Sequence, residues 1–251
     1  MENQELINKL ESYSEYELND YLASHPVKEN ILRRFIDRVD WEIVSHYQTL
    51  SESFIREFAN RVDWYKISWA QTLSEPFIRE FFYTVDWNGI SWSQELSEDF
   101  IREFADKVDW VGISFSQKLS ESFIREYADK VEWDSISEHQ KLSEPFIKEF
   151  ADMVDWPCIT FYQQLSESFI RELADTVYWP GLSENQKLSE DFIREFADKV
   201  YWKGISGYQQ LSESFIREFS DRVDWDSLNE NKNIHFDIRQ LRQSILSSYS
   251  D

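Results

Sequence analysis

Residues 96–117 read LSEDFIREFADKVDWVGISFSQ, and close copies of this stretch recur along the chain. Tryptophans mark the recurrence at intervals of 23 residues: Trp41, Trp64, Trp87, Trp110, Trp133, Trp156, Trp179, Trp202 and Trp225. Counted from each Trp as repeat position 0, the unit reads W-x-x-I-S-x-x-Q-x-L-S-E-x-F-I-R-E-F-A-D-K-V-D. Self-similarity at such a period is typical of a solenoid, in which each unit contacts its neighbours.

Each unit contains two amphipathic helical patterns. In the first, Trp, Ile, Ser and Gln occupy positions 0, 3, 4 and 7, which form one face of a helix. In the second, apolar residues occupy positions 13, 14, 17, 18 and 21. We therefore predict an all-α protein, a right-handed α-solenoid of two-helix repeats with helical caps. The regularly spaced tryptophans are predicted to lie in its structural core, between the units.

Capping residues and prolines support this placement of the helices. Asp precedes the Trp in most units, at Asp40, Asp63, Asp86, Asp109, Asp155 and Asp224, and Ser precedes the second helix within Leu-Ser-Glu. Both residue types accept hydrogen bonds from free N–H groups at a helix start. Pro76, Pro145, Pro157 and Pro180 each follow a capping position by two residues. They fall in a first turn, where a missing N–H costs little.

Departures from the pattern define the ends of the array. Residues 1–39 are predicted to form a helical cap with a degenerate repeat, in which Leu18 replaces Trp and Val27, Ile31, Leu32, Phe35 and Val39 take the core positions. Residues 40–224 are predicted to hold eight tandem repeats. Residues 225–251 are predicted to form a partial repeat and a capping helix with Phe236, Leu241 and Ile245 on its apolar side. Terminal repeats of a solenoid need such a polar outer face.

Ser at position 4 and Gln at position 7 share a face with Trp and Ile, so burial of both is expected. We favour an interpretation in which Gln bonds unsatisfied backbone groups and Ser bonds back within its own helix. The alternative is a polar ladder that grips an extended ligand. Small residues recur at position 2 (Gly89, Gly112, Ser135, Cys158, Gly181, Gly204, Ser227) and at position 18 (mostly Ala), where neighbouring backbones are predicted to approach closely.

Charges on the second helix have the spacing of ion pairs within one helix. Glu98 precedes Arg102, and Glu103 precedes Lys107, by four residues each. The whole chain carries 48 acidic and 26 basic residues, a formal net charge of -22. This balance makes nucleic acid an unlikely partner, because binding it normally requires Lys and Arg. It suits basic partners, or simply solubility.

Nothing in the sequence has the pattern of a catalytic or metal site. The single cysteine, Cys158, excludes an intramolecular disulfide, and the four histidines lack metal-ligand spacing. Phosphate-binding and nucleophile motifs are missing from the sequence. The acidic start MENQELINKLESYSEYELND has no signal-peptide pattern, and no run of apolar residues is long enough for a membrane helix. We therefore expect a cytoplasmic protein that is not an enzyme, has no cofactor or metal and is not bound to a membrane.

Binding residues are expected at the positions that vary between units. At positions 1 and 5, the second to fourth units place Tyr65, Trp69, Trp92 and Phe115, and the second unit also has Phe82 and Tyr83 at positions 18 and 19. Aromatic side chains are the usual anchors of protein interfaces. We predict that these six residues bind a protein partner with apolar and basic groups. The alternative is that the rings turn inward and add to the core.

A second function remains open for such an acidic chain: a decoy that mimics nucleic acid and sequesters a basic nucleic-acid-handling protein. A unit carries a net charge of about -2 per layer of about 10 Å, whereas duplex DNA carries about six charges in that length. The dilute charge makes the decoy the second choice behind a non-enzymatic scaffold.

The pattern W-x-x-I-S-x-x-Q-x-L-S-E, as it stands in residues 96–117 and its copies, resembles tandem helical repeats of uncharacterised proteins of large DNA viruses and some phages. The likeness covers residues 27–228. It implies an array of helical hairpins and a viral protein that acts in the host cytoplasm. It implies no catalytic residues.

Overall fold

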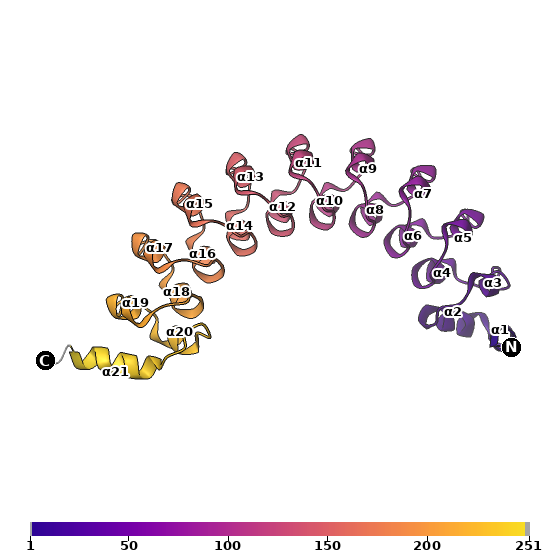
Figure 1. The fold of residues 1–251 in the computed structure, drawn as a ribbon. Coiled ribbons are helices and arrows are strands. Elements are labelled where there is room, and N and C mark those ends of the chain that lie inside the picture. The colour runs from indigo at the N-terminus through magenta and orange to yellow at the C-terminus, as the bar shows by residue number, and fades with distance from the viewer. Residues whose placement is uncertain (1, 249–251) are drawn as a thin grey trace. The chain divides into compact units, whose positions relative to one another are not determined.

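Residues 2–248 are described by the computed structural model, and they form twenty-one helices and no strand, which confirms the all-α prediction. The chain divides into two compact units, Met1–Val131 and Glu132–Asp251, and each unit is a helical-repeat solenoid. No helix among the described residues is long and apolar enough to cross a membrane. Within each unit, the first helices of successive repeats lie side by side in one row and the second helices form another row (Figure 1).

The first helix of each repeat begins at the regularly spaced tryptophan. In Met1–Val131 these helices are α4 (Trp41–Tyr47), α6 (Trp64–Ala70), α8 (Trp87–Ser93) and α10 (Trp110–Ser116). In Glu132–Asp251 they are α12 (Trp133–His139), α14 (Trp156–Tyr162), α16 (Trp179–Asn185), α18 (Trp202–Tyr208) and α20 (Trp225–Glu230). The predicted caps are confirmed, because Asp40, Asp63, Asp86, Asp109, Asp155 and Asp224 all accept backbone N–H bonds at these starts.

The second helix of each repeat begins after a serine, as predicted. These helices are α5 (Glu52–Glu57), α7 (Glu75–Glu80), α9 (Glu98–Glu103) and α11 (Glu121–Glu126) in the first unit. In the second unit they are α13 (Glu144–Glu149), α15 (Glu167–Glu172), α17 (Glu190–Glu195) and α19 (Glu213–Glu218). Each serine hydroxyl accepts the N–H of the following Phe, and the four prolines lie in first turns.

The second helix is shorter than its apolar pattern predicts. It ends at position 16, and the apolar residues at positions 17, 18 and 21 lie in the turn that follows. In the repeat that starts at Trp41, Phe58 leaves helical geometry at φ -111° and ψ 26°. The Ala59 carbonyl then accepts the indole N–H of Trp64 at 2.8 Å, and the Asp63 N–H turns to the Ser45 hydroxyl at 2.9 Å. A continuing helix would pair that carbonyl with that N–H, but the carbonyl bonds Trp64 of the next repeat and the N–H bonds Ser45 of the same repeat.

The buried Gln side chains satisfy backbone groups of the preceding repeat, and the buried Ser side chains satisfy backbone groups of their own repeat. Gln94 donates from Nε2 to the carbonyls of Ser68 (3.1 Å) and Gln71 (2.7 Å), and its Oε1 accepts the Leu73 N–H at 2.8 Å. Ser91 donates to the Trp87 carbonyl of its own helix at 2.7 Å. The glutamines at position 7 are at most 7 % exposed. The favoured interpretation is therefore confirmed, and the ligand-gripping ladder is wrong because no ligand can reach these side chains.

The core is built mainly from the Phe and Ile positions rather than from tryptophan. Phe77, Ile78 and Ile90 are at most 1 % exposed, whereas all nine regularly spaced tryptophans are half-buried. Trp64 lies at the edge of the core, with its ring centroid 4.7 Å from that of Phe81 in the same repeat. Its indole N–H needs a hydrogen-bond acceptor, which it finds in the turn before its own helix. The tryptophans thus join repeats at the rim of the core.

The segments 1–39 and 225–251, which the sequence predicts to be caps, are helical where the structure describes them, and residues 1 and 249–251 lie outside the described part. The N-terminal cap consists of α1 (Glu2–Glu11), α2 (Glu15–Ser24) and α3 (Glu29–Leu32), with Leu18 fully buried. At the other end, α21 (Ile238–Ser248) buries Leu241 and Ile245, while Phe236 is half-buried just before it.

Candidate interaction surface

The first helices of Met1–Val131 carry four of the six predicted binding residues on their outward side. Tyr65 is 56 % exposed, Trp69 36 % and Phe115 46 %, and Trp92 is half-buried. They come from α6, α8 and α10, which are consecutive helices of one row. We call these four residues the aromatic surface. Its rings associate in two pairs, with centroids 6.2 Å apart for Tyr65–Trp69 and 5.2 Å apart for Trp92–Phe115.

Each indole of the aromatic surface lies over a glycine of the next repeat. A Cβ atom on Gly89 would stand 2.7 Å from Trp69 Cδ1, and a Cβ atom on Gly112 would stand 2.6 Å from Trp92 Cδ1. Real Cβ atoms do not approach other atoms so closely, so both positions require glycine. The predicted close approach at position 2 is confirmed, but in the first unit the approaching group is an indole ring rather than a backbone.

The capping aspartates hold the same two indoles. Trp69 donates its Nε1–H to Asp86 at 3.1 Å, and Trp92 donates to Asp109 at 2.7 Å. The Asp86 carboxylate also accepts the Gly89 N–H at 2.7 Å and so caps α8. One face and the N–H edge of each indole therefore belong to the scaffold, while part of each ring remains in contact with solvent. The rings therefore pack against the scaffold and also remain accessible.

Phe82 and Tyr83 lie elsewhere, in the turn between α7 and α8. Phe82 is half-buried and packs against Phe104 of the next repeat, with ring centroids 6.1 Å apart. Its carbonyl accepts the indole N–H of Trp87 at 3.1 Å. Tyr83 projects from the turn and is 86 % exposed. The structure therefore gives Phe82 a role in packing between repeats, and it separates both residues from the helices that carry the aromatic surface.

Charged groups border the aromatic surface. Lys66 lies 5.6 Å from the centre of the Tyr65 ring and forms an ion pair with Glu42 at 3.2 Å. The hydrogen bond that Lys66 donates to Glu42 raises the pKa of Lys66 above its ordinary value, so the ammonium stays charged at neutral pH. The background charge of the chain is strongly negative, at -22. A partner that approaches this surface meets exposed rings in an acidic field.

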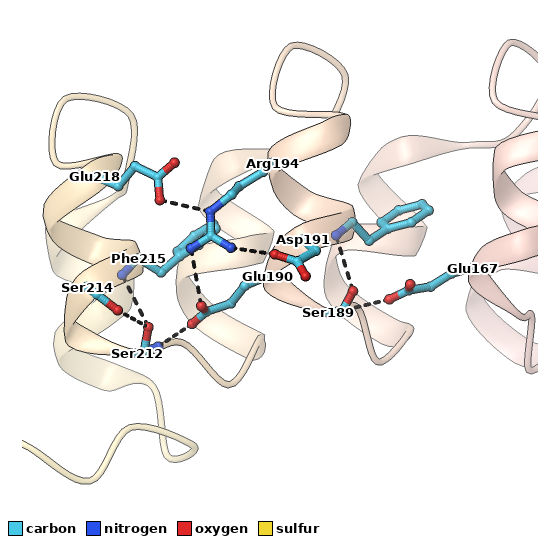
Figure 2. Close-up of polar contacts among 10 residues, drawn as sticks. Glu167, Ser189, Glu190, Asp191, Arg194, Ser212, Ser214, Phe215 and Glu218 are labelled. Carbon is cyan, nitrogen blue, oxygen red and sulfur yellow. Dashed lines mark hydrogen bonds and ion pairs between the residues drawn. The ribbon is translucent and has the colours of Figure 1, made fainter.

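Charged side chains of the second helices form ion pairs and hydrogen bonds with adjacent repeats. Figure 2 shows the arrangement in the second unit, where Arg194 reaches Glu218 of the next repeat at 2.8 Å. The same guanidinium lies 5.1 Å from the centre of the Phe215 ring and 2.8 Å from Asp191. Glu190 accepts the Ser212 N–H of the next repeat at 2.6 Å. These cations and carboxylates are used to join repeats, which leaves the second-helix row poorly suited to select a partner.

Of the two ion pairs predicted within one helix, Glu98–Arg102 forms and Glu103–Lys107 does not. Glu98 and Arg102 form the predicted pair at 3.6 Å. Glu103 instead contacts Arg79 of the preceding repeat at 2.7 Å, and Lys107 lies near Asp106 at 3.9 Å. The predicted Glu103–Lys107 pair is wrong because α9 ends at Glu103, so Lys107 is not one helical turn away.

Cys158 stands at the small-residue position of α14 and is half-buried. Burial, followed by a hydrogen bond with Asp155, raises the pKa of its thiol to about 12. The thiol is therefore protonated at neutral pH and is a poor nucleophile. Among residues 2–248, no group of three or more His, Cys, Asp or Glu side chains is arranged to hold a metal ion.

Sequence reasoning found the aromatic surface but missed how it is seated. The signal was present: Trp69 and Trp92 each precede a glycine by 20 residues and an aspartate by 17 residues. The tryptophans stand at position 5, the glycines at position 2 of the next repeat and the aspartates at position 22 of the same repeat, so each indole reaches the start of the following unit.

Comparisons of this chain with protein-family models, with curated proteins and with solved structures found no match.

Proposed function

We propose that this protein is a non-enzymatic scaffold that binds a protein partner through the aromatic surface of Met1–Val131. The observation that carries the proposal is the exposure of large rings on α6 and α10, 56 % for Tyr65, 36 % for Trp69 and 46 % for Phe115, with the half-buried Trp92 on α8. A soluble protein seldom leaves adjacent aromatic side chains open to water unless another molecule covers them. The rings are also held rigidly, which lowers the entropy lost when a partner binds.

The chemistry of the surface indicates the partner. Tryptophan and tyrosine at the centre of an interface are common energetic anchors. Their faces attract cations, and the charge of -22 draws basic proteins toward the chain and accelerates encounter. We therefore propose a protein partner that places apolar side chains and Arg or Lys against the aromatic surface. The resemblance of the repeats to viral repeats supports the further proposal that this complex forms in the cytoplasm of an infected host.

The test compares substitutions at equivalent positions of the two units. Trp69→Ser and Trp92→Ser remove rings of the aromatic surface, whereas Phe161→Ser removes a ring that is 43 % exposed at the same repeat position in the second unit. Partners captured from lysate are quantified by mass spectrometry at about 0.15 M and about 0.5 M salt. We expect a specific partner that the wild-type chain and Phe161→Ser retain at both salt concentrations. Each tryptophan variant should capture at least about tenfold less of this partner than the wild-type chain does.

Folding is controlled by circular dichroism, because each indole also contacts the scaffold. The proposal is wrong if the tryptophan variants remain folded and capture the same proteins as the wild-type chain. Capture that disappears at the higher salt in all four proteins would instead favour the acidic decoy, because screening weakens purely electrostatic binding.

A further inference from the structure

The second unit contains a hollow of about 620 Å³ on the side of its first helices. It is bounded by α16, α18, α20 and the segment after α20, and Gly207 of α18 lines it. This volume is within the range of ligand-binding pockets, about 300–1,000 Å³. Gly207 stands at repeat position 5, where the preceding repeats have His46, Trp69, Trp92, Phe115, Glu138, Phe161 and Glu184. The hollow thus lies where other repeats supply a side chain and this repeat does not.

The fold does not require a glycine at residue 207. A Cβ atom there would meet the Ser227 Cβ at 3.7 Å, which is an ordinary contact. By contrast, a Cβ atom on Gly89, Gly112 or Gly204 would come within 2.8 Å of a neighbouring side chain. Glycine is less favourable than alanine inside a helix, because it loses more backbone freedom on folding. Gly207 therefore weakens α18 without relieving a clash, and its effect on the structure is to keep the hollow open.

The walls of the hollow combine aromatic rings with charges of both signs. Tyr201 and Tyr208 line it and are 40 % and 59 % exposed. Lys203, Lys232, Glu184 and Glu230 also line it.

Lys232 stands at repeat position 7, where earlier repeats have the buried glutamine. Asn231 takes over the hydrogen bonds of that glutamine, to the carbonyls of Ser206 and Gln209, and Lys232 is therefore exposed at the hollow.

The first unit shows what fills the equivalent place. Trp92, at position 5, covers the next repeat and donates its indole N–H to Asp109, 17 residues later. Seventeen residues after Gly207 stands Asp224, which caps α20 by accepting the Ser227 N–H at 2.7 Å. This repeat thus has the aspartate that can accept an indole N–H, Asp224, but has Gly207 in place of the tryptophan. Ser227 carries a Cβ where Gly112 has none, so a ring here stands farther from the helix and enters from solvent.

We propose that this hollow binds an aromatic side chain, preferably tryptophan, of a partner polypeptide. The incoming ring takes the place left by Gly207, beside the lining residues Tyr201 and Tyr208, and donates its N–H to Asp224, which bonds the lining residue Ser227. The lysines and glutamates around the rim face the amide and carbonyl groups of the bound segment. The site belongs to Glu132–Asp251 and shares no residue with the aromatic surface, so it stands or falls independently of the proposed function.

Glycine signals provide a direct test, because the chain has only five glycines, at residues 89, 112, 181, 204 and 207. The full chain is labelled with ¹⁵N-glycine and titrated with the unlabelled blocked tripeptide acetyl-Gly-Trp-Gly-amide, and amide shifts are followed by NMR. We expect saturable shifts at Gly207 and Gly204, and none at Gly89 and Gly112. The matched peptide acetyl-Gly-Leu-Gly-amide should bind at least tenfold more weakly. Free tryptophan should bind no more tightly than the blocked peptide.

Substitutions locate the binding. Gly207→Phe fills the hollow and should weaken the tryptophan peptide at least tenfold, read from Gly204, while Gly207→Ala should change affinity less than threefold. Unchanged signals of Gly89 and Gly112 report that the rest of the chain is intact. If Gly207→Phe does not fold, Tyr208→Ala removes one wall and should weaken binding at least threefold. The proposal is overturned by unmoved Gly207 and Gly204 signals, by equal binding of the leucine peptide, by tighter binding of free tryptophan, or by normal binding of the tryptophan peptide to Gly207→Phe or Tyr208→Ala.

Discussion

Replacing Gln94 with methionine tests the series of hydrogen bonds, here called the ladder, in which the buried glutamine of each repeat bonds the end of the first helix in the preceding repeat. Methionine is close to glutamine in length and volume, so packing is retained while the amide is lost. The change leaves three backbone groups without their partner: the Leu73 N–H and the carbonyls of Ser68 and Gln71. Gln94 is 4 % exposed, so water replaces these bonds poorly. At about 1–3 kcal/mol for each unsatisfied buried group, and with partial relaxation, the variant should lose about 3–5 kcal/mol of unfolding free energy.

Two measurements check this magnitude. Urea denaturation should show a lower midpoint for Gln94→Met, whereas substitution of the neighbouring exposed Glu95 by Ala should change the free energy of unfolding by less than about 0.5 kcal/mol. Hydrogen exchange should show loss of protection at the Leu73 amide. A loss of under about 1 kcal/mol with a protected Leu73 amide would refute the reasoning, because it would mean that the ladder contributes little beyond packing.

Three further predictions follow from the contacts between repeats. Arg56 donates to Glu80 and lowers the pKa of Glu80 below its ordinary value of 4.5, so Glu80→Gln should reduce the melting temperature at pH 7; this difference should shrink below pH 4.5 and vanish below the lowered pKa, and a pH-independent difference would contradict it. Gly89→Ala should destabilise by about 1–3 kcal/mol, because its Cβ would overlap the indole above it, whereas Gly207→Ala should stabilise by about 1 kcal/mol in the same urea assay; equal effects would argue against the packing described. Because the pKa of Cys158 is about 12, its alkylation by iodoacetamide at pH 8 should be about a thousandfold slower in the folded than in the urea-unfolded chain, and comparable rates would show that the thiol is not shielded.

The sequence predicted the features that depend on one repeat, because those features recur at fixed positions. The caps at Asp63 and Ser51, the proline turns and the two-helix unit all follow from local chemistry. The type of partner for Gln94 was also predictable, since a buried amide beside helix ends must bond their free carbonyls. Which carbonyls it bonds was not predictable, because they lie at the C-terminal end of α6 in the preceding repeat, and their place beside Gln94 depends on how adjacent repeats align.

Contacts between repeats were harder to predict than contacts within them. Glu103 has a basic residue at helical spacing in its own repeat and another in the preceding repeat, and spacing alone does not choose between Lys107 and Arg79. The early end of the second helix decides the outcome, and that end depends on the indole of the next unit. For the aromatic surface, Trp69 was predictable as a variable residue, but its place over Gly89 required knowledge of how adjacent helices align.

The ladder gives the array a direction. Gln94 bonds the free carbonyls at the C-terminal end of α6 in the preceding repeat, so each repeat is completed by the one that follows. A block of 23 residues inserted between two repeats adds one first helix and one glutamine, so no helix end is left without its hydrogen bonds. A block of another length displaces every later glutamine from the helix end that it bonds. Asn231 ends the series with a shorter amide that reaches the carbonyls of Ser206 and Gln209. Such a chain can grow or shrink by whole units during evolution while its two ends stay the same.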